Sequence, residues 1–280
     1  QAIFKAQQMA ASLALHAQKQ RQRTQHLQWL PRQMRRRTTD FTGVVIGADA
    51  PVVVAFGVVE DLPQLPAARA IGLACAQALD LAAATDDPDC APRAAFLTPI
   101  AKAYGTDVGC RVADMGVQVH GGMGFIEETG AAQYLRDVRI TPIYEGTNGI
   151  QAIDLVLRKM SDGGEMAFRL LDEIMDGAKA AQGEMPDLAR AVWDAAETLR
   201  EATVTMIESG QTDRLAGAMP YLNAFARVLG AHYHLRAAVE GGPATLARVH
   251  VNRILPQFCA DLAAVRAGQP PRFAAAGGPP

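Results

Sequence analysis

An all-α fold is predicted by the composition and by the spacing of apolar residues. Hydrophobic residues make up 49% of the 280 residues but aromatic residues only 6%, so the core must be built mainly from Ala, Leu, Val and Ile. An alanine-rich, aromatic-poor chain favours packed helices over a sandwich of strands. From residue 67 onward, apolar residues recur every three to four positions, which is the period of a helix that buries one face.

Residues 1–66 do not share this pattern. Residues 1–39 contain eight Lys or Arg and no Asp or Glu, whereas residues 43–59 are apolar and rich in β-branched Val. Such disagreement between neighbouring segments argues against a well-specified fold. We therefore expect residues 1–66 to form an irregular, poorly specified segment that is either disordered or translated in a shifted reading frame.

Two helices are predicted next. Residues 67–84 carry a helical stripe, which the sequence Asp86-Asp87-Pro88-Asp89 ends. After a loop that reaches about Arg93, residues 94–119 carry a second stripe. The stripes consist of Ile71, Ala74, Ala78 and Leu81 in the first helix, and of Ile100, Tyr104, Val108, Val112, Met115 and Val119 in the second.

The middle of the chain combines a glycine-rich turn with two further helices. Three of the four residues 121–124 are Gly, so continuing the helix there would be costly. We expect a short helix at 131–138 and an extended stretch at 139–144. Thr147 is a suitable N-cap for a helix over 148–160.

The rest of the chain is also predicted to be helical. Asp162-Gly163-Gly164 marks a boundary, and Pro220 and Pro256 are expected to break or kink the last two helices because Pro lacks the N–H that a helix needs. The expected helices are 165–181, 187–208, 213–240 and 244–266. The sequence therefore suggests four parts: the irregular segment 1–66, a helical domain at 67–162, a further helical domain at 163–267, and a disordered tail at 268–280.

Charge and cysteine content exclude several classes of protein. The net charge of −2 gives no global reason to expect nucleic acid or an anionic membrane as partner. The four cysteines form no Cys-x-x-Cys pair, so neither a zinc site nor a disulfide framework is indicated, and a reducing compartment is favoured. No membrane span is expected, because no apolar run approaches the roughly 18 residues that a span requires.

One acid has an unusual setting. Glu145 stands between Tyr144 and Gly146, just before the Thr147 helix start, and the glycine-rich sequence Gln118-Val-His-Gly-Gly-Met-Gly124 lies about twenty residues upstream. A carboxylate on a tight turn can act as a base if the site around it is dry. The simpler alternative is an exposed acid favoured by the positive end of a helix dipole. His120, inside the glycine-rich sequence, is assigned a packing or hydrogen-bonding role.

Taken with Leu135-Arg136-Asp137, these two motifs resemble the flavin and active-site region of the acyl-CoA dehydrogenases. The resemblance covers residues 67–160, the second half of that family's C-terminal four-helix domain, so it implies a partial four-helix bundle. The sequences at 96–105 and 124–130 look most like the long family members, which carry an extra helical domain after the active-site helix. Residues 165–266 fit such an extension.

The resemblance also implies roles for individual residues. Glu145 would be the base that removes a proton from the substrate, and Tyr144 and Gly146 would contact that substrate. Gln118, Gly121, Gly122 and Thr147 would bind FAD, the glycines closing on its adenosine diphosphate part, usually across to a neighbouring subunit. Simpler alternatives remain for two of these groups: the glycines could just end a helix, and Thr147 could act only as an N-cap.

The partners follow from the same resemblance. It implies an acyl-CoA substrate, FAD as cofactor, electron-transfer flavoprotein as electron acceptor, and a homodimer or tetramer. The expected location is the bacterial cytoplasm, or the mitochondrial matrix in a eukaryote.

The sequence departs from the family at several points. Gln133 replaces the usual Lys or Arg, Asn148-Gly149 replaces the more usual Ser-Gln, and the N-terminal helical and middle β domains are absent from these 280 residues. We therefore expect the 280-residue chain alone neither to hold FAD firmly nor to turn over substrate. The rival hypotheses are an inactive helical fragment or interaction module that keeps the fold, and a nucleic-acid or targeting arm at residues 1–39.

Overall fold

The structure is a computed structural model that describes residues 64–268. Within that range all regular elements are helical and there is no strand, which confirms the all-α prediction. The helices are α4 (Gln64–Ala84), α5 (Cys90–His120), α6 (Gly122–Phe125), η2 (Glu127–Thr129), α7 (Ala131–Arg139), α8 (Asn148–Asp154), η3 (Leu155–Lys159), α9 (Glu165–Ala181), α10 (Pro186–Glu208), α11 (Gln211–Val239), α12 (Ala244–Val249), η4 (His250–Ile254), η5 (Leu255–Gln257) and α13 (Phe258–Ala267). The predictions for residues 1–63 and 269–280 lie outside the described residues.

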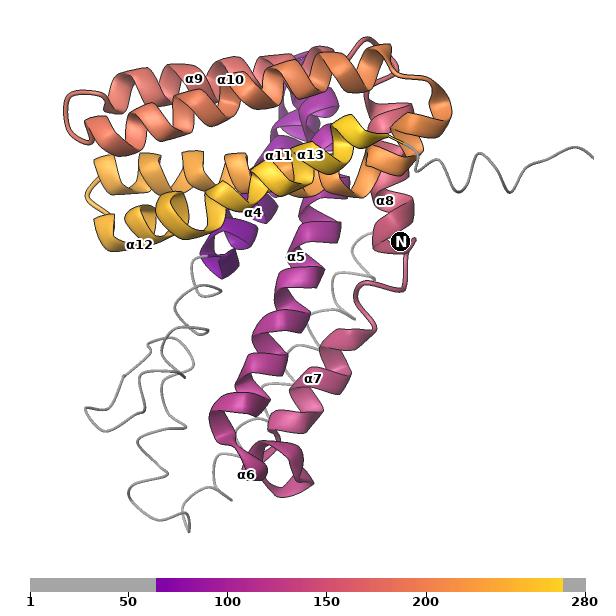
Figure 1. Ribbon diagram of the computed structural model, residues 1–280, viewed down its shortest axis with the longest axis vertical. Helices are drawn as coiled ribbons and strands as arrows, with labels where there is room; N and C mark the ends of the chain where they lie inside the picture. Colours follow the sequence, from indigo (N-terminus) through magenta and orange to yellow (C-terminus); the bar gives the residue numbers. More distant parts are fainter. Residues whose placement is uncertain (1–63, 269–280) are drawn as a thin grey trace, which may run out of the picture. The chain divides into compact units, whose positions relative to one another are not determined.

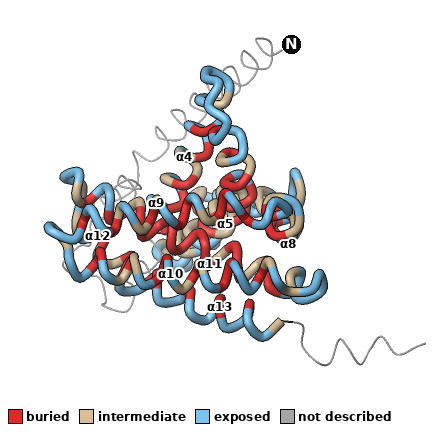
Figure 2. Tube along the Cα trace, turned by 90° about the horizontal axis from the view of Figure 1, so that it is seen from above, coloured by how far each residue is buried: buried red, intermediate tan, exposed pale blue. Residues whose placement is uncertain are grey.

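Helix α11 lies at the centre of the packing. It contacts α4, α5 and α8 as well as α9, α10, α12 and α13, and Figure 1 shows the α9–α10 pair and the α12–α13 segment lying along it. Sixteen of its residues are buried, including every position from Ala224 to His232. A helix that is buried on all sides needs partners on all sides. Accordingly, Figure 2 shows buried residues where the helices meet and exposed ones on their outer faces.

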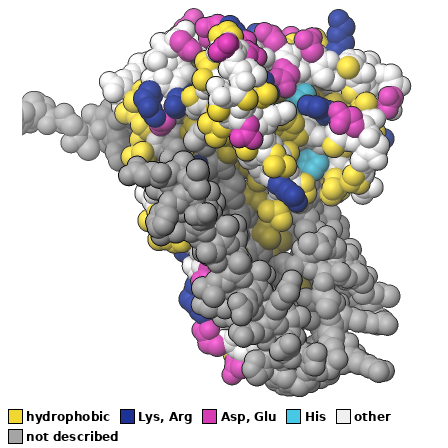
Figure 3. Space-filling model, turned by 180° about the vertical axis from the view of Figure 1, so that it is seen from behind, with side chains coloured by type: hydrophobic (Ala, Val, Ile, Leu, Met, Phe, Trp, Pro, Cys, Tyr) yellow, Lys and Arg dark blue, Asp and Glu magenta, His cyan; other side chains and the backbone are white. Residues whose placement is uncertain are grey.

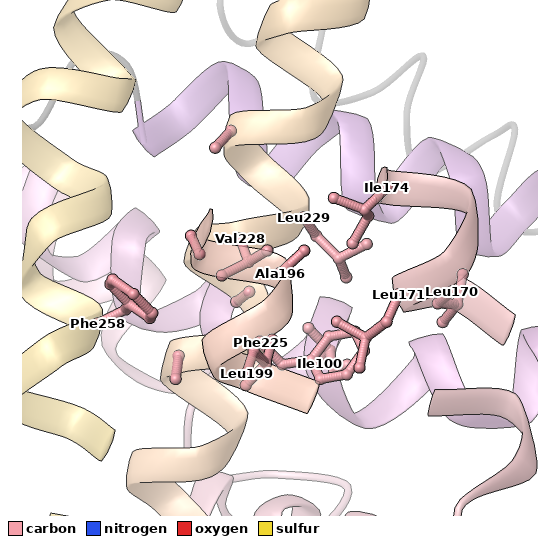
Figure 4. Close-up of a cluster of buried hydrophobic side chains, with 14 of the residues drawn as sticks. Ile100, Leu170, Leu171, Ile174, Ala196, Leu199, Phe225, Val228, Leu229 and Phe258 are labelled. Carbon is pink, nitrogen blue, oxygen red and sulfur yellow. The ribbon is translucent and has the colours of Figure 1, made fainter. Parts of the chain in front are cut away.

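A continuous hydrophobic core joins the two halves of the described residues. Figure 4 shows Ile100 of α5 and Phe225 of α11 close to Leu199 of α10 and Leu171 of α9, and the same cluster extends to Phe258 of α13. The Phe96 and Phe225 rings meet edge to face with centroids 5.1 Å apart, a favourable aromatic geometry. The described residues fall within one contact unit. The proposed division at residue 163 therefore stays a prediction, and it separates helices that share one core.

The second half of α5 leaves this core. All nine buried residues of α5 lie between Cys90 and Val108, and none lies beyond. From there α7 covers one side of α5 closely: a Cβ atom added to Gly109 would lie 3.2 Å from Val138 Cγ2. Figure 1 shows α5 extending past the central helices, with α7 alongside and α6 at its far end. We call residues 109–140 the arm.

The arm exposes an unusual amount of apolar surface. Five of its large hydrophobic side chains are more than a third exposed, and Phe125 reaches 80%. They are Val119, Met123, Phe125, Tyr134 and Ile140. Contiguous exposed apolar surface of this kind usually marks a contact with another molecule or domain.

Two details of the predicted helices were wrong, and a third was too broad. The stretch 139–144 is not extended: Arg139 ends α7, and successive turns close with Ile143 N and Tyr144 N donating to Ile140 O at 3.0 and 3.1 Å. Helix α11 is not broken at Pro220, which excludes the first of the two expected outcomes there, because packing around the helix outweighs the one lost hydrogen bond. The predicted loop before Arg93 is shorter, since α5 begins at Cys90.

The predicted helix 244–266 is divided, as expected from Pro256. A π-helical segment (η4) and a 3-10 segment (η5) separate α12 from α13, and Pro256 lies in the first turn of η5. Asp162 also has the boundary role that its sequence suggested, because its Oδ1 accepts hydrogen bonds from Gly164 N at 2.9 Å and Glu165 N at 3.2 Å at the start of α9.

One helix bears on the expectation that the chain has no membrane span. Among residues 64–268, α4 alone is long and apolar enough to cross a membrane by length and composition. Ala67, Ile71 and Ala78 are buried on its inner face, where α4 packs against α5 and α11, and 28% of its most apolar window is buried. Figure 3 shows acidic, basic and hydrophobic side chains interspersed over one face of the helices.

Candidate active site

The loop between α7 and α8 is closed by backbone hydrogen bonds. Tyr144 N donates to Ile140 O at 3.1 Å, and Asn148 N donates across the loop to Pro142 O at 3.1 Å. Thr147 Oγ1 accepts from Ile150 N at 3.4 Å, so the predicted N-cap is confirmed. These bonds fix both ends of the short segment that carries Glu145.

Glu145 has a strained backbone. Its φ of 55° makes it the one non-glycine residue with positive φ among residues 64–268, and Gly146 follows at φ 87°. The left-handed region costs a residue with a side chain about 1–2 kcal/mol. Glycine carries no such penalty at the second position, which explains Gly146. Strain of this kind is retained where the surrounding structure enforces it, and such places are often functional sites.

Three side chains hold the strained loop. Gln151 Nε2 donates to Glu145 O at 3.1 Å. Lys102 Nζ, from α5, donates to Gly146 O at 2.7 Å and to Asn148 Oδ1 at 2.9 Å. Both peptide groups that flank the Gly146 Cα are therefore fixed through their carbonyl oxygens.

Asn148 joins this loop to α5. Its side chain is buried, with Nδ2 donating to Asp107 Oδ1 at 2.7 Å, to Thr106 Oγ1 at 3.0 Å and to Ala103 O at 3.1 Å. Because Asn148 Oδ1 also accepts from Lys102, both ends of the amide are satisfied, as buried polar groups require.

The Glu145 carboxylate itself is exposed and has apolar neighbours in the sequence. Tyr144 and Ile143 are about half exposed, and Ile150 on the first turn of α8 is 55% exposed. The Gly146 N–H makes no hydrogen bond within the described residues. An acyl chain could cover the apolar side chains, and a carbonyl oxygen could accept from that N–H. The dry surroundings that a carboxylate base needs are not supplied by residues 64–268 alone.

The glycine-rich turn lies at the far end of the arm. Gly121 has φ 60° and donates to Gln118 O at 3.0 Å, which ends α5, and the Gln118 side chain is exposed. Nothing lies within 4 Å of the Cβ positions of Gly121 and Gly122, so the backbone is open to a ligand there. His120 Nδ1 lies 2.7 Å from Gly116 O, which confirms its hydrogen-bonding role.

The structure does not bring the two motifs together within one chain. Lys102 contacts the Glu145 loop, and Gly121 comes 19 residues later along α5, which at 1.5 Å per residue is roughly 28 Å. A ligand that reached both motifs within one chain would have to span about this distance. The glycine-rich turn offers an accessible backbone and the exposed side-chain amide of Gln118, and the loop offers the hydroxyl of Thr147. This donor set fits a dinucleotide such as FAD, whose phosphates and ring edges accept hydrogen bonds.

The sequence interpretation missed Lys102 and Gln151, and it treated Asn148 as a departure from a pattern. Lys102 stands next to apolar stripe positions of α5, where an isolated lysine was a visible but weak signal. Nothing local connects it to a loop 44 residues away. Among the residues that the structure describes, no group of three or more His, Cys, Asp or Glu side chains is placed to hold a metal ion.

Comparisons with known proteins agree with the motifs. Residues 59–160 match the family model described as Acyl-CoA dehydrogenase, C-terminal domain. The chain is 40% identical over 168 residues to 3-methylmercaptopropionyl-CoA dehydrogenase of Ruegeria pomeroyi, a match that covers 55% of this chain and 28% of that protein. It is 32% identical over 104 residues to the very long-chain specific acyl-CoA dehydrogenase of Rattus norvegicus, covering 37% of this chain and 15% of that protein.

A solved structure shows the same fold. The crystal structure of ACDH-11 from Caenorhabditis elegans, in complex with C11-CoA, aligns with a TM-score of 0.63 and 21% identity over 75% of this chain and 37% of that one. The chain thus spans about a quarter of the length of the first of these relatives and less than half of the structural neighbour.

Proposed function

We propose that this chain, whose residues 59–160 match the family model of the acyl-CoA dehydrogenase C-terminal domain, carries the catalytic base of an FAD-dependent oxidoreductase. The reaction would be α,β-dehydrogenation of an acyl-CoA thioester, with Glu145 removing the α proton. The single observation that carries the proposal is the backbone of Glu145: a strained acid, held on a hydrogen-bonded loop with its carboxylate free.

The residues around Glu145 have complementary tasks in this proposal. The carboxylate accepts the α proton, and the Gly146 N–H donates to the thioester oxygen, on which negative charge develops as the proton leaves. Tyr144 lies beside the acyl chain. A bound substrate would also exclude water from the exposed carboxylate and so raise its basicity.

FAD would be held at the two motifs. Thr147 contributes its hydroxyl, which can donate while its oxygen caps α8, and Gln118, Gly121 and Gly122 contribute an exposed amide and open backbone. When bound, FAD would supply the acceptor for the hydride from the β carbon. Because the motifs lie far apart along α5, the glycine motif would serve a neighbouring subunit. The apolar surface of the arm supports such a homodimer or tetramer.

Electron-transfer flavoprotein would reoxidise the flavin, and the protein would act in the bacterial cytoplasm or, in a eukaryote, the mitochondrial matrix. The relatives include bacterial and mitochondrial enzymes.

The test is Glu145→Gln in the natural protein that carries this sequence. The substitution keeps the shape of the side chain and removes its basicity. The rate of flavin reduction by acyl-CoA under anaerobic conditions should fall by roughly 10²- to 10⁴-fold, while FAD stays bound. Glu184→Gln, at an exposed position between α9 and α10, is the matched control and should reduce flavin at the wild-type rate. Near-normal reduction in the Glu145 variant would sink the assignment.

The alternative is an inactive helical fragment or interaction module that keeps the family fold. The exposure of Glu145 favours it, because residues 64–268 do not enclose the carboxylate. The flavin content of the purified natural protein distinguishes the two. Stoichiometric flavin that bleaches on addition of acyl-CoA supports the enzyme, whereas protein that stays colourless after incubation with FAD supports the module.

A further inference from the structure

We propose that Lys102 and Asn148 are positioning residues that hold Glu145 in its catalytic orientation. This inference rests on the proposed function, since it gives Glu145 the role of base. It extends that function to two side chains that touch neither substrate nor flavin in the proposed scheme and that act through the loop. We call the Lys102–Asn148 pair, with its contacts to Gly146 and Asp107, the latch.

The latch contacts the loop at a backbone carbonyl. Lys102 Nζ donates to Gly146 O, the carbonyl directly after the residue pair with positive φ. Gln151 holds the preceding carbonyl, that of Glu145, at 3.1 Å. With both carbonyls fixed, the two planar peptide groups that flank the Gly146 Cα cannot rotate freely, so the backbone from which the Glu145 side chain leaves is constrained.

The latch is held to α5 by the buried side chain of Asn148. Asn148 is 7% exposed, and its amide bridges Lys102 to Asp107 one turn further along α5. The Lys102 ammonium bonds two neutral oxygens, and the Asp107 carboxylate on the other side of the amide balances its charge. Charge-assisted hydrogen bonds are stronger than neutral ones, and a network that is fully satisfied makes its surroundings rigid.

The backbone conformation of the loop requires contacts that stabilise it. The left-handed backbone at Glu145 is unfavourable for a residue with a side chain, so a free loop would relax to another conformation. General-base catalysis demands an orientation that is fixed before the substrate binds, because a small displacement of a reacting group is costly in rate. The latch thus explains why Asn follows Thr147 here, where the family resemblance led us to expect Ser.

The structural half of the test uses the 280-residue chain. In Lys102→Met, hydrogen exchange at the amides of Tyr144 and Asn148, which close the loop, should accelerate by roughly tenfold or more, while amides inside α10 exchange as in the wild type. Lys102→Gln, which lacks the charge and the reach, should behave alike. Lys179→Met, at an exposed lysine of α9, is the control and should leave the loop amides unchanged. Unchanged exchange in both Lys102 variants would overturn the latch.

The functional half uses the natural protein with its flavin. At saturating acyl-CoA, Lys102→Met should lower the rate constant of flavin reduction by roughly tenfold to a hundredfold, with half-saturation changing by less than about threefold. Lys102→Arg should recover part of the rate. Adding Lys102→Met to Glu145→Gln should cost less than about threefold more, because the group being positioned is already gone.

The positioning role would be overturned if Lys102→Met lowered the rate constant of flavin reduction by the same factor with Glu145 as with Gln at position 145. A wild-type rate of flavin reduction in Lys102→Met would overturn it as well. If the wild-type protein shows no reduction by acyl-CoA at all, the proposed function fails, and the exchange experiment still decides whether the latch holds the loop.

Discussion

His232, on the central helix α11, is a buried histidine with charged neighbours from two other helices. It is 4% exposed, and its Nε2 lies 4.0 Å from Glu173 Oε1 on α9, with Arg93 of α5 and Arg236 of α11 also nearby. Burial lowers the pKa of His232 to about 4, which outweighs the attraction of Glu173 and adds to the repulsion by the two arginines. At neutral pH the ring is therefore uncharged and forms no ion pair with Glu173.

A pH dependence of stability follows. Between pH 6.5 and pH 4 the unfolded chain binds a proton at residue 232 and the folded chain does not, so stability falls as the pH falls through this window and the loss ends near pH 4. The difference in pKa corresponds to about 3 kcal/mol. Urea unfolding at several pH values should show that His232→Gln loses about 3 kcal/mol less than the wild type between pH 7 and pH 4. Parallel curves for His232→Gln and wild type would contradict the assignment.

Single residues were predictable where a local rule applies. Thr147 as N-cap and Asp162 at a helix boundary each depend on neighbours within three residues, so the sequence was sufficient. Glu145 was identified by a motif, but its positive φ was not, because the contacts that enforce it come from Lys102 and Gln151. The polar contacts of His232 depend on helices that lie 59 and 139 residues upstream, at Glu173 and Arg93. No sequence pattern reports such distances.

At the scale of elements, a π-helical segment links the candidate site to the C-terminal helices. η3 follows α8 directly, and the wider turn of a π-helix disturbs the regular pairing of backbone groups. Arg214 Nη2, from the start of α11, donates a hydrogen bond to Val156 O in this segment. The side chain of Arg214 is half-buried, and its Nε has no partner within the described residues. Arg214 thus stabilises the irregular end of the helix that begins at Thr147.

Removing this contact should loosen η3. Arg214→Met removes a hydrogen bond from a charged group to the carbonyl of the buried residue Val156, and such a bond contributes about 1.5–3 kcal/mol. Hydrogen exchange at residues 159–161 should accelerate relative to residues in α10, and the urea midpoint should fall. Arg190→Met, which breaks only an exposed pair with Asp194 one helical turn away, should change the free energy of unfolding by about 0.5 kcal/mol or less. Equal effects of the two substitutions would show that Arg214 contributes no more than a surface charge.

Elements themselves were predicted best where the periodic pattern was long. The expected helix 165–181 agrees with α9 at both ends, and 187–208 differs from α10 by one residue. The stretch 139–144 was mistaken because its Ile and Thr residues favour strands locally, while hydrogen bonds to Ile140 O turn the chain. Pro220 was given too much weight, since the neighbours of α11 keep it helical. Tertiary packing decided both cases.

At the scale of the molecule, the question is whether residues 64–162 and 163–268 unfold separately. Ile100 of α5 belongs to the first part and Leu171, Leu199 and Phe225 to the second, yet all four are fully buried in one cluster. Figure 4 draws side chains from both parts within one cluster of buried hydrophobic residues. A shared core couples the unfolding of both parts, although relatives of the long type suggest an added domain.

We therefore expect one cooperative transition. With Trp29 replaced by Phe, Trp193 of α10 becomes the single tryptophan and reports on the second part, while far-UV circular dichroism reports on all helices. Ile100→Ala, in the first part, removes a fully buried side chain and should cost about 2–5 kcal/mol. The urea midpoints from Trp193 fluorescence and from circular dichroism should fall together. Leu79→Ala, at a 55% exposed position of α4, should change the free energy of unfolding seen by either probe by about 0.5 kcal/mol or less.

If Ile100→Ala moves only the circular dichroism midpoint, the two parts are independent domains and the division at residue 163 is a folding boundary. A joint shift of both midpoints means that the C-terminal helices stabilise the loop that carries Glu145.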